Sequence, residues 1–250
     1  MSSPSTGKMN LPYLIILILI GIFAFVSIVY ARYQNIFILN KIIISGNQEL
    51  KEEEIIYISG LELGSDILKI SVLDIIEKLE QEPFIRQAQV YKRLPDCMII
   101  NIRERIPILI MNLNETYAID NMGILLPGPR DRKDLPVLTG IPSIITTDYG
   151  KTVSQPQIRQ GTGIISLIRK KYPEINLMIT ELHWSEESSG WIIKTGSGGG
   201  MIYLGQNDLK NRIHTLDAFI KQREMNRDKL KNYTYIDLRY DKQVIVKPGR

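Results

Sequence analysis

Residues 83–107, PFIRQAQVYKRLPDCMIINIRERIP, contain two short runs in which apolar and polar residues alternate. The apolar positions of the two runs are Ala88, Val90, Met98, Ile100 and Ile102. A period of two residues is typical of strands with one buried face. Pro95 and Asp96 stand between the runs, where proline lacks a ladder donor and aspartate favours a turn. The stretch therefore predicts two paired strands that reverse at Pro95-Asp96.

The preceding segment predicts one strand and two helices. Residues 36–44, IFILNKIII, read as a strand that is closed by the turn residues Ser45-Gly46-Asn47. A helix is expected from near Leu50, because three glutamates follow and negative charge in a first turn complements the helix dipole. Ser71 and Asp74 form a capping-box-like start for a second helix, whose apolar face comprises Val72, Ile75, Ile76 and Leu79. The order over residues 36–104 is β-α-α-β-β.

The N-terminal segment has the length and composition of a membrane anchor. Residues 9–31 contain no charged side chain, and residues 11–30 are mostly Leu, Ile, Phe and Val. A helix of this length spans about 35 Å, which exceeds the roughly 30 Å of a hydrocarbon core. A cleaved signal would have a shorter apolar region, although Val29-Tyr30-Ala31 resembles a weak cleavage site. Lys8 on one side and Arg32 with Lys41 on the other leave the orientation undecided by charge.

The composition of the whole chain is that of a globular protein with an anchor. The sequence is 44% hydrophobic and 23% charged, with a net charge of +4. The part after residue 31 is longer than the usual domain of about 100–150 residues, so two domains are expected. The mild basicity could favour an anionic membrane surface, but no basic cluster indicates a nucleic-acid partner. Cys97 is the single cysteine, so an intramolecular disulfide is excluded.

The second half of the chain predicts a strand-rich domain with two helices. Short strands are expected at residues 108–113, 116–119 and 124–126, followed by a run at 135–140. Further strands are expected around residues 177–183, 191–194, 201–204, 235–240 and 243–247. One helix is predicted from the shared face of Ile164, Ile165 and Ile168 before Pro173, and another from Leu209, Ile213, Leu216 and Ile220. The fold class is therefore α+β.

Many residues of this chain stand where a known family has its motifs. The positions at the strand pair are Pro83, Phe84, Ile85, Ala88, Val90, Arg93, Pro95, Met98, Ile100, Ile102, Glu104, Arg105 and Pro107. They resemble the end of the POTRA domain in the bacterial cell-division family FtsQ/DivIB. Residues 135–140, 202–205 and 235–240 resemble later segments of the same family, in the same order. The resemblance extends over residues 9–250.

The resemblance implies a domain organisation and a topology. Residues 1–8 would be a short cytoplasmic tail, residues 9–31 the transmembrane anchor, residues 36–104 a POTRA domain, and residues 105–250 a β domain with a C-terminal edge strand. The body would lie outside the cytoplasm, with the protein in the cell (inner) membrane at the division septum. The family's role implies a non-enzymatic divisome scaffold that recruits and regulates septal cell-wall synthesis. FtsB-like and FtsL-like membrane proteins would be its partners, and other division proteins would bind the POTRA domain.

Residues that suggest catalysis or a cofactor have simpler interpretations. The glycine-rich run at residues 195–200 lies between predicted strands and lacks a following Gly-Lys-Ser/Thr, so a hairpin loop is favoured over a phosphate loop. His183 and His214 show no metal-ligand spacing, and no Gly-x-Ser-x-Gly is present. Cys97 lies beside the turn of the strand pair. We expect no enzyme activity, no metal and no cofactor.

The candidate binding site is the last predicted strand. Val244 and Val246 alternate with Gln243, Ile245 and Lys247, and Pro248 ends the run. As an outermost strand it would offer unpaired backbone groups to an FtsB-like segment. The expected partner-binding residues are Arg239, Tyr240, Lys242, Gln243, Val244, Ile245 and Val246. Two alternatives are that the valines only pack the core, and that the chain is a membrane-tethered POTRA chaperone or polypeptide-transport component.

Overall fold

The computed structural model describes residues 11–33, 36–128, 134–141, 148–196, 200–223, 227–230, 232–241 and 243–249. Contacts divide the chain into two compact units. The first comprises Met1–Glu80 and Gln87–Arg103, and the second comprises Gln81–Arg86 and Glu104–Arg250. The chain therefore passes from one unit to the other three times.

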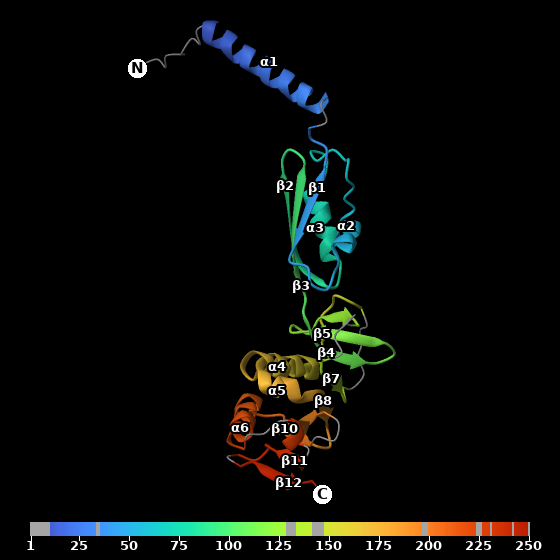
Figure 1. The fold of residues 1–250 in the computed structure, drawn as a ribbon, viewed down its shortest axis with the longest axis vertical. Coiled ribbons are helices and arrows are strands. Elements are labelled where there is room, and N and C mark those ends of the chain that lie inside the picture. Colours follow the sequence, from blue (N-terminus) through green and yellow to red (C-terminus); the bar gives the residue numbers. More distant parts are fainter. Residues whose placement is uncertain are drawn as a thin grey trace, which may run out of the picture. The chain divides into compact units, whose positions relative to one another are not determined.

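Helix α1 (Leu11–Tyr33) is the long blue helix of Figure 1. Its stretch Pro12–Tyr30 is long and apolar enough to cross a membrane, and none of that stretch is buried inside the protein. Exposed apolar side chains along a whole helix are stable in lipid rather than in water. One such helix fits the single-pass anchor expected from the sequence. The expected cytoplasmic tail, residues 1–8, lies outside the described residues.

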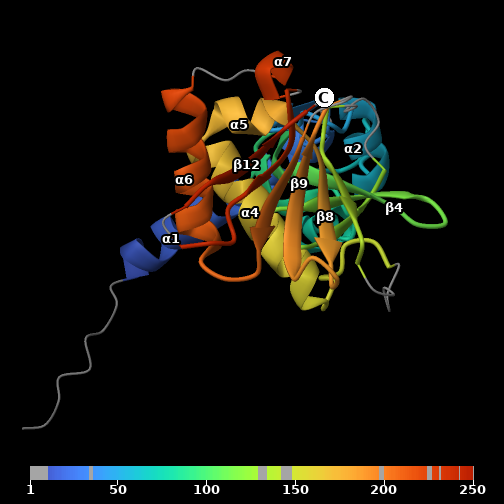
Figure 2. The same ribbon diagram turned by 90° about the horizontal axis from the view of Figure 1, so that it is seen from below.

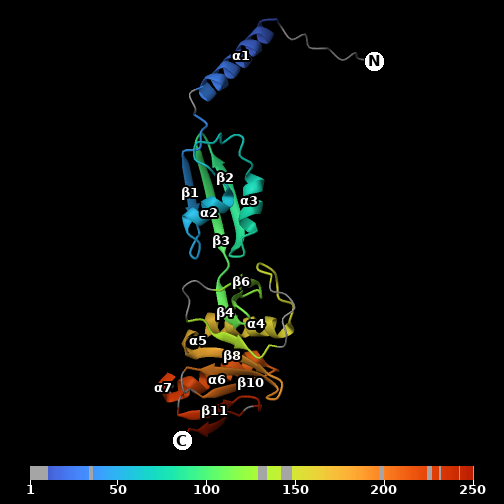
Figure 3. The same ribbon diagram turned by 90° about the vertical axis from the view of Figure 1, so that its right-hand side faces the viewer.

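The first unit has the β-α-α-β-β order that the sequence predicts. Its elements are β1 (Lys41–Ser45), α2 (Glu52–Ser59), α3 (Val72–Glu80), β2 (Ile85–Arg93) and β3 (Cys97–Glu104). The strands lie in the order β1-β3-β2, and β1 runs parallel to β3. Figure 3 shows α2 and α3 beside this sheet. The buried side chains include Ile55, Leu79, Val90, Met98 and Ile100, so the helices and strands share one core.

Local details of the first unit confirm the strand pair and the cap, and they move one boundary. Along β2 and β3 the expected apolar positions are buried, while Gln87, Gln89 and Arg103 are exposed. The backbone N–H of Asp74 donates to Ser71 Oγ at 3.3 Å, as expected of a helix start. The first strand begins at Lys41 rather than at residue 36. Residues 37–39 instead form hydrogen bonds with residues 64–67, which keeps them out of the sheet.

The second unit is one mixed sheet with helices on one face. The strands are β4 (Pro107–Asn112), β5 (Thr116–Asp120), β6 (Leu125–Pro127), β7 (Val137–Thr139), β8 (Ile179–Ser185), β9 (Gly190–Thr195), β10 (Met201–Gly205), β11 (Tyr233–Asp237) and β12 (Ile245–Pro248). Their order is β12-β11-β10-β9-β8-β7-β4-β5-β6. The helices are α4 (Pro156–Lys171), α5 (Pro173–Met178), α6 (Leu209–Gln222) and α7 (Arg227–Leu230). Figure 2 shows α4, α5 and α6 together on one side of β8, β9 and β12.

The core of this unit lies between the sheet and the helices. Isoleucines of α4 and α6, including Ile165 and Ile213, belong to one cluster with Trp191 of β9 and Leu204 of β10. These positions recur at helical spacing on α4 and α6, which explains why the sequence predicts both helices. Strand residues outside this cluster, including Ala118, Leu126 and Ile192, are buried as well.

The structure adds two short helices to those expected and shifts the last strands. Pro173 follows α4 as predicted, but it also occupies the first turn of α5. An N–H at that position would have no acceptor within the helix, so proline is tolerated there. The strand expected from residue 177 therefore begins at Ile179. Strand β11 ends at Asp237 and β12 begins at Ile245, so Arg239 and Tyr240 lie in the connection between them rather than in a strand.

Candidate functional site

Strand β12 stands at one end of the nine-stranded order, with β11 as its neighbour. The two strands are antiparallel, with Asp237 opposite Ile245 and Ile236 opposite Val246. Backbone groups of alternate residues in an edge strand point away from the sheet and can pair with another extended segment. Pro248 ends the strand without an N–H, which limits this open ladder to the residues before it.

The side chains of the predicted binding residues differ in exposure. Ile245 and Val246 are 38% and 37% exposed, so both are partly open to solvent rather than alternating. Val244 is half-buried and packs against the core, which fits the packing alternative for that residue alone. Gln243 and Tyr240 are exposed, whereas Lys242 lies outside the described residues.

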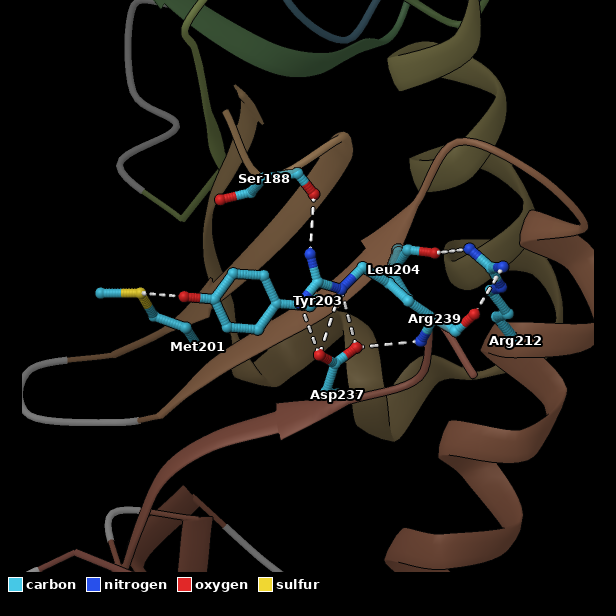
Figure 4. Close-up of polar contacts among 7 residues, drawn as sticks. All are labelled: Ser188, Met201, Tyr203, Leu204, Arg212, Asp237 and Arg239. Carbon is cyan, nitrogen blue, oxygen red and sulfur yellow. Dashed lines mark hydrogen bonds and ion pairs between the residues drawn. The ribbon is translucent and has the colours of Figure 1, made fainter. Parts of the chain in front are cut away.

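Arg239 is held by the protein itself rather than presented to solvent. Figure 4 shows its guanidinium between the Asp237 carboxylate and the Ser188 carbonyl. Its Nη2 and Nε donate to Asp237 Oδ2 at 2.6 and 3.1 Å, and Nε also donates to Oδ1 at 2.9 Å. Its Nη1 donates to the Ser188 carbonyl at 2.9 Å. The guanidinium carbon lies 4.8 Å from the centre of the Tyr203 ring, which is a cation–π distance.

The Asp237–Arg239 pair is electrostatically coupled. Burial alone would raise the pKa of the Asp237 carboxyl, but hydrogen bonds and charge from Arg239 outweigh it and lower that pKa below its ordinary value. The same hydrogen bond raises the pKa of Arg239, so this side chain stays charged. The backbone N–H of Arg239 also donates to Asp237 Oδ1 at 3.0 Å, which closes a tight turn directly after β11. The pair therefore fixes the backbone that leads into β12.

Arg212 of α6 supports the same turn from the helix side. Its guanidinium donates to the Leu204 carbonyl and, at 3.1 Å, to the Arg239 carbonyl. Arg212, Tyr203 and Ser188 were not among the residues singled out from the sequence. No local pattern could have identified them, because Ser188 and Arg212 contact a residue 51 and 27 positions away in the chain. They position the edge strand, and they are not free to meet a partner with the same groups.

A hollow lies next to the start of β12. Its volume is about 390 Å³, and its lining includes Asp208, Arg212, Thr215, Tyr240, Asp241 and Gln243. Tyr240 and Gln243 therefore line a depression beside the edge rather than a flat surface. A segment paired to β12 could place a side chain there, next to both polar and aromatic atoms.

The residues that could suggest catalysis have structural neighbours. His183 on β8 shares a 2.7 Å hydrogen bond with Thr139 Oγ1, and burial lowers its pKa. His214 on α6 lies 3.4 Å from the Tyr172 hydroxyl, and Cys97 is buried. Within the described part of the chain, no three His, Cys, Asp or Glu side chains are grouped to hold a metal ion. Residues 197–199 of the glycine-rich run lie outside the described residues.

Two family models match this chain and together cover most of its body. Residues 37–105 match the FtsQ-type POTRA domain, and residues 108–239 match the C-terminal domain of the cell-division protein FtsQ/DivIB. The first unit accordingly has the expected POTRA order of elements, and the second match ends at Arg239, just before the edge strand.

Curated relatives agree with the family models. The chain is 26% identical over 211 residues to cell division protein FtsQ of Geobacter sp. (strain M21), covering 84% of this chain and 75% of that protein. It is 24% identical over 243 residues to FtsQ of Syntrophotalea carbinolica, covering 96% and 83%. It is 23% identical over 213 residues to cell division protein DivIB of Clostridium tetani, covering 82% and 77%. The chain belongs to the FtsQ/DivIB family of cell-division proteins.

Proposed function

We propose that this protein is a non-enzymatic divisome scaffold that captures a partner strand at β12. The observation that carries the proposal is the position of β12 at the end of the nine-stranded order, with Ile245 and Val246 partly exposed. An added strand gains backbone hydrogen bonds along the edge and side-chain contacts at alternate positions. FtsB-like and FtsL-like membrane proteins are the partners, and their capture recruits and regulates septal cell-wall synthesis.

The edge is prepared for binding by the contacts behind it. Ordering a strand on binding costs backbone entropy, and a preorganised edge avoids this cost on one side of the interface. The Asp237–Arg239 pair and Arg212 fix the turn before β12, while Val244 packs into the core. Tyr240, Lys242 and Gln243 then add side-chain specificity next to the paired backbone. In this arrangement Arg239 acts as a positioning residue.

The proposed topology and location are supported by the single apolar helix and by the membership of a cell-division family. Helix α1 spans the cell membrane once, with the N-terminus in the cytoplasm and the body outside it, and the protein acts at the division septum. Other division proteins bind the POTRA unit. An alkaline phosphatase fused after Arg250 should be active, whereas a reporter that needs the cytoplasm should be silent there. A mature product that begins at Arg32 would contradict the anchor.

Two proline substitutions test the edge. Consecutive N–H groups of a strand point in opposite directions, so Ile245→Pro and Val246→Pro each remove one donor, one facing β11 and one facing outward. We expect the outward variant to lose capture of an FtsB-like protein while its melting temperature stays unchanged. Ile245→Val keeps the donor and the branched shape, and it should bind like the wild type. Tyr240→Ala and Lys242→Glu should weaken binding without abolishing it.

The assay is a pull-down from membranes with the body from residue 32 onward as bait. Recovery of small single-pass coiled-coil proteins, lost in one proline variant, supports strand addition. Full capture by both folded proline variants would place the binding face elsewhere. Recovery of nascent outer-membrane chains instead would favour a chaperone or transport role.

A further inference from the structure

One end of the first unit is built from three chain segments that bond to one another. These are residues 36–40, residues 63–69 and residues 92–96, together called the linker-side end. The Ile67 N–H donates to the Phe37 carbonyl at 2.9 Å, and the Asn40 N–H donates to the Asp96 carbonyl at 2.9 Å. Lys92 Nζ donates to the Leu68 carbonyl at 3.2 Å. The three segments therefore form one continuous surface.

Large aliphatic side chains are exposed on all three segments of this end. The exposed fractions are 42% for Ile36, 65% for Leu63, 38% for Leu68 and 55% for Leu94. A single exposed leucine needs no explanation on a soluble surface. Four exposed aliphatic residues on three mutually bonded segments do need one, because grouped exposed apolar residues mark contact sites for proteins or membranes.

The chain itself places this end close to the membrane. Helix α1 carries Tyr30 and Tyr33 at its C-terminal end, and tyrosines are enriched where a spanning helix meets the headgroups. Ile36 follows Tyr33 by three residues, which reach at most about 11 Å when fully extended. The headgroup layer on each side of the hydrocarbon core is itself about 5–8 Å thick. Whatever path the link takes, Ile36 at the start of this end remains within about 11 Å of Tyr33.

The charges of the linker-side end are compatible with a lipid surface. Its charged residues are basic Lys69, Lys92 and Arg93 and acidic Asp66 and Asp96. Basic Lys41 and acidic Glu62 adjoin it. The Lys69 side chain is 80% exposed and reaches Asp66 only at 4.0 Å. Lysine can rest its aliphatic stem on an apolar layer while its ammonium meets lipid phosphates. The balance is nearly neutral, so the leucines rather than the charges dominate this contact.

We propose that the linker-side end rests on the bilayer surface, with Leu63, Leu68 and Leu94 at the boundary between headgroups and acyl chains. The contact rests on α1 being a membrane anchor, and it adds a second, peripheral attachment to that anchor. A POTRA unit attached at two places keeps one face toward the membrane, whereas a unit on a flexible link would turn freely.

Depth-dependent quenching in nanodiscs tests this contact with the full chain. Cys97→Ala removes the native thiol, and an environment-sensitive fluorophore is placed in turn at Leu63→Cys, Leu94→Cys or Arg103→Cys. Arg103 lies seven residues beyond Asp96 along β3, about 23 Å away at the rise of a strand. A label at Val26→Cys inside α1 reports on the anchor independently. The quencher is a spin-labelled phosphatidylcholine mixed with phosphatidylglycerol.

We expect quenching at positions 63 and 94, strong quenching at 26, and none at 103. The proposal would be overturned if the labels at 94 and 103 were quenched equally. It would also be overturned if the labels at 63 and 94 were not quenched while the label at 26 was. Absence of quenching at 26 would instead refute the anchor itself.

A second variant separates apolar contact from mere proximity. Leu63→Asp with Leu68→Asp should abolish quenching of the label at 94 and leave the label at 26 unchanged. Leu73→Asp with Tyr57→Asp changes two exposed apolar residues on α3 and α2, outside the linker-side end, and should leave both signals unchanged. Undiminished quenching at 94 in the Leu63/Leu68 variant would show that the leucines do not make the contact.

Discussion

Asp237→Asn should destabilise the second unit far more than the same change in an exposed ion pair. The Asp237 side chain is 7% exposed, and it accepts hydrogen bonds from the backbone and guanidinium of Arg239. Asparagine keeps one acceptor oxygen, but it removes the charge and turns an amide toward the guanidinium. Breaking a fully buried pair costs about 3–5 kcal/mol.

The expected loss at Asp237 is smaller than this limit. Arg239 is 33% exposed and keeps the Ser188 carbonyl, so part of its charge can be compensated by water. We therefore expect a loss of about 2 kcal/mol in the free energy of unfolding. The control is Asp148→Asn, because Asp148 and Lys151 form a pair whose side chains are 62% and 68% exposed. That change should cost at most about 0.5 kcal/mol.

Urea unfolding followed by tryptophan fluorescence measures this difference. The chain has two tryptophans, Trp184 and Trp191, and both belong to the second unit, so the signal reports on that unit. Equal losses for the two variants would refute the stabilising role of the pair.

The difference between wild type and Asp237→Asn should also depend on pH. Because the pKa of Asp237 is lowered in the folded state, its contribution is complete above the unfolded carboxyl pKa of about 3.9. The contribution is lost as the pH falls through the folded pKa. The stability gap should be constant near neutral pH and should close below about pH 4. A gap that stays open in acid would show that the side chain acts through shape alone.

Three further substitutions test other parts of the fold. Leu79→Asp puts a charge into the core of the first unit and should lower its free energy of unfolding by at least about 3 kcal/mol. The control, Leu73→Asp on the exposed side of the same helix, should change it by less than about 0.5 kcal/mol. Hydrogen exchange of β2 and β3 measures both. Asp120→Ala removes the acceptor of two turn N–H groups and of the half-buried Arg105, so tryptophan-monitored unfolding should show a loss of about 3 kcal/mol. An unchanged free energy of unfolding would contradict the stabilising role of this turn. Gly140 has a positive φ, and Gly140→Ala would push a Cβ into a carbonyl of β8, so this variant should melt at a lower temperature than the wild type. Gly163 faces open space within α4, so Gly163→Ala should raise the melting temperature.

The alternation and helix faces in the sequence predict most of the fold correctly. Local signals suffice for β2, β3, α3, α4 and α6, because each buries one periodic face against a sheet or helix. The predicted α3 face is also correct, although Ile76 is half-buried while Leu79 is fully buried. How many residues of a helix become buried depends on the strands and helices that pack against it, which a single sequence does not specify.

The last strand shows why the sequence says less about the site than about the fold. The alternation of Val244 and Val246 suggests one buried face, but Val246 is 37% exposed on the last strand of the sheet. Arg239 carries a charge that suggests a partner contact, yet Asp237 and a carbonyl 51 residues upstream already bind it. Such long-range pairing leaves no periodic signal. The partner-binding role of β12 and its neighbours stays a prediction.

The three passages of the chain between the units have a consequence for the engineering of this protein. Gln81–Arg86 belong in space to the second unit, although both flanking segments belong to the first. Within the second unit, the Arg105 N–H donates to the Phe84 carbonyl at 2.7 Å. A gene fusion with one crossover near residue 105 would therefore give the second unit a foreign copy of residues 81–86. Exchange of a whole unit between relatives therefore requires three matched junctions instead of one.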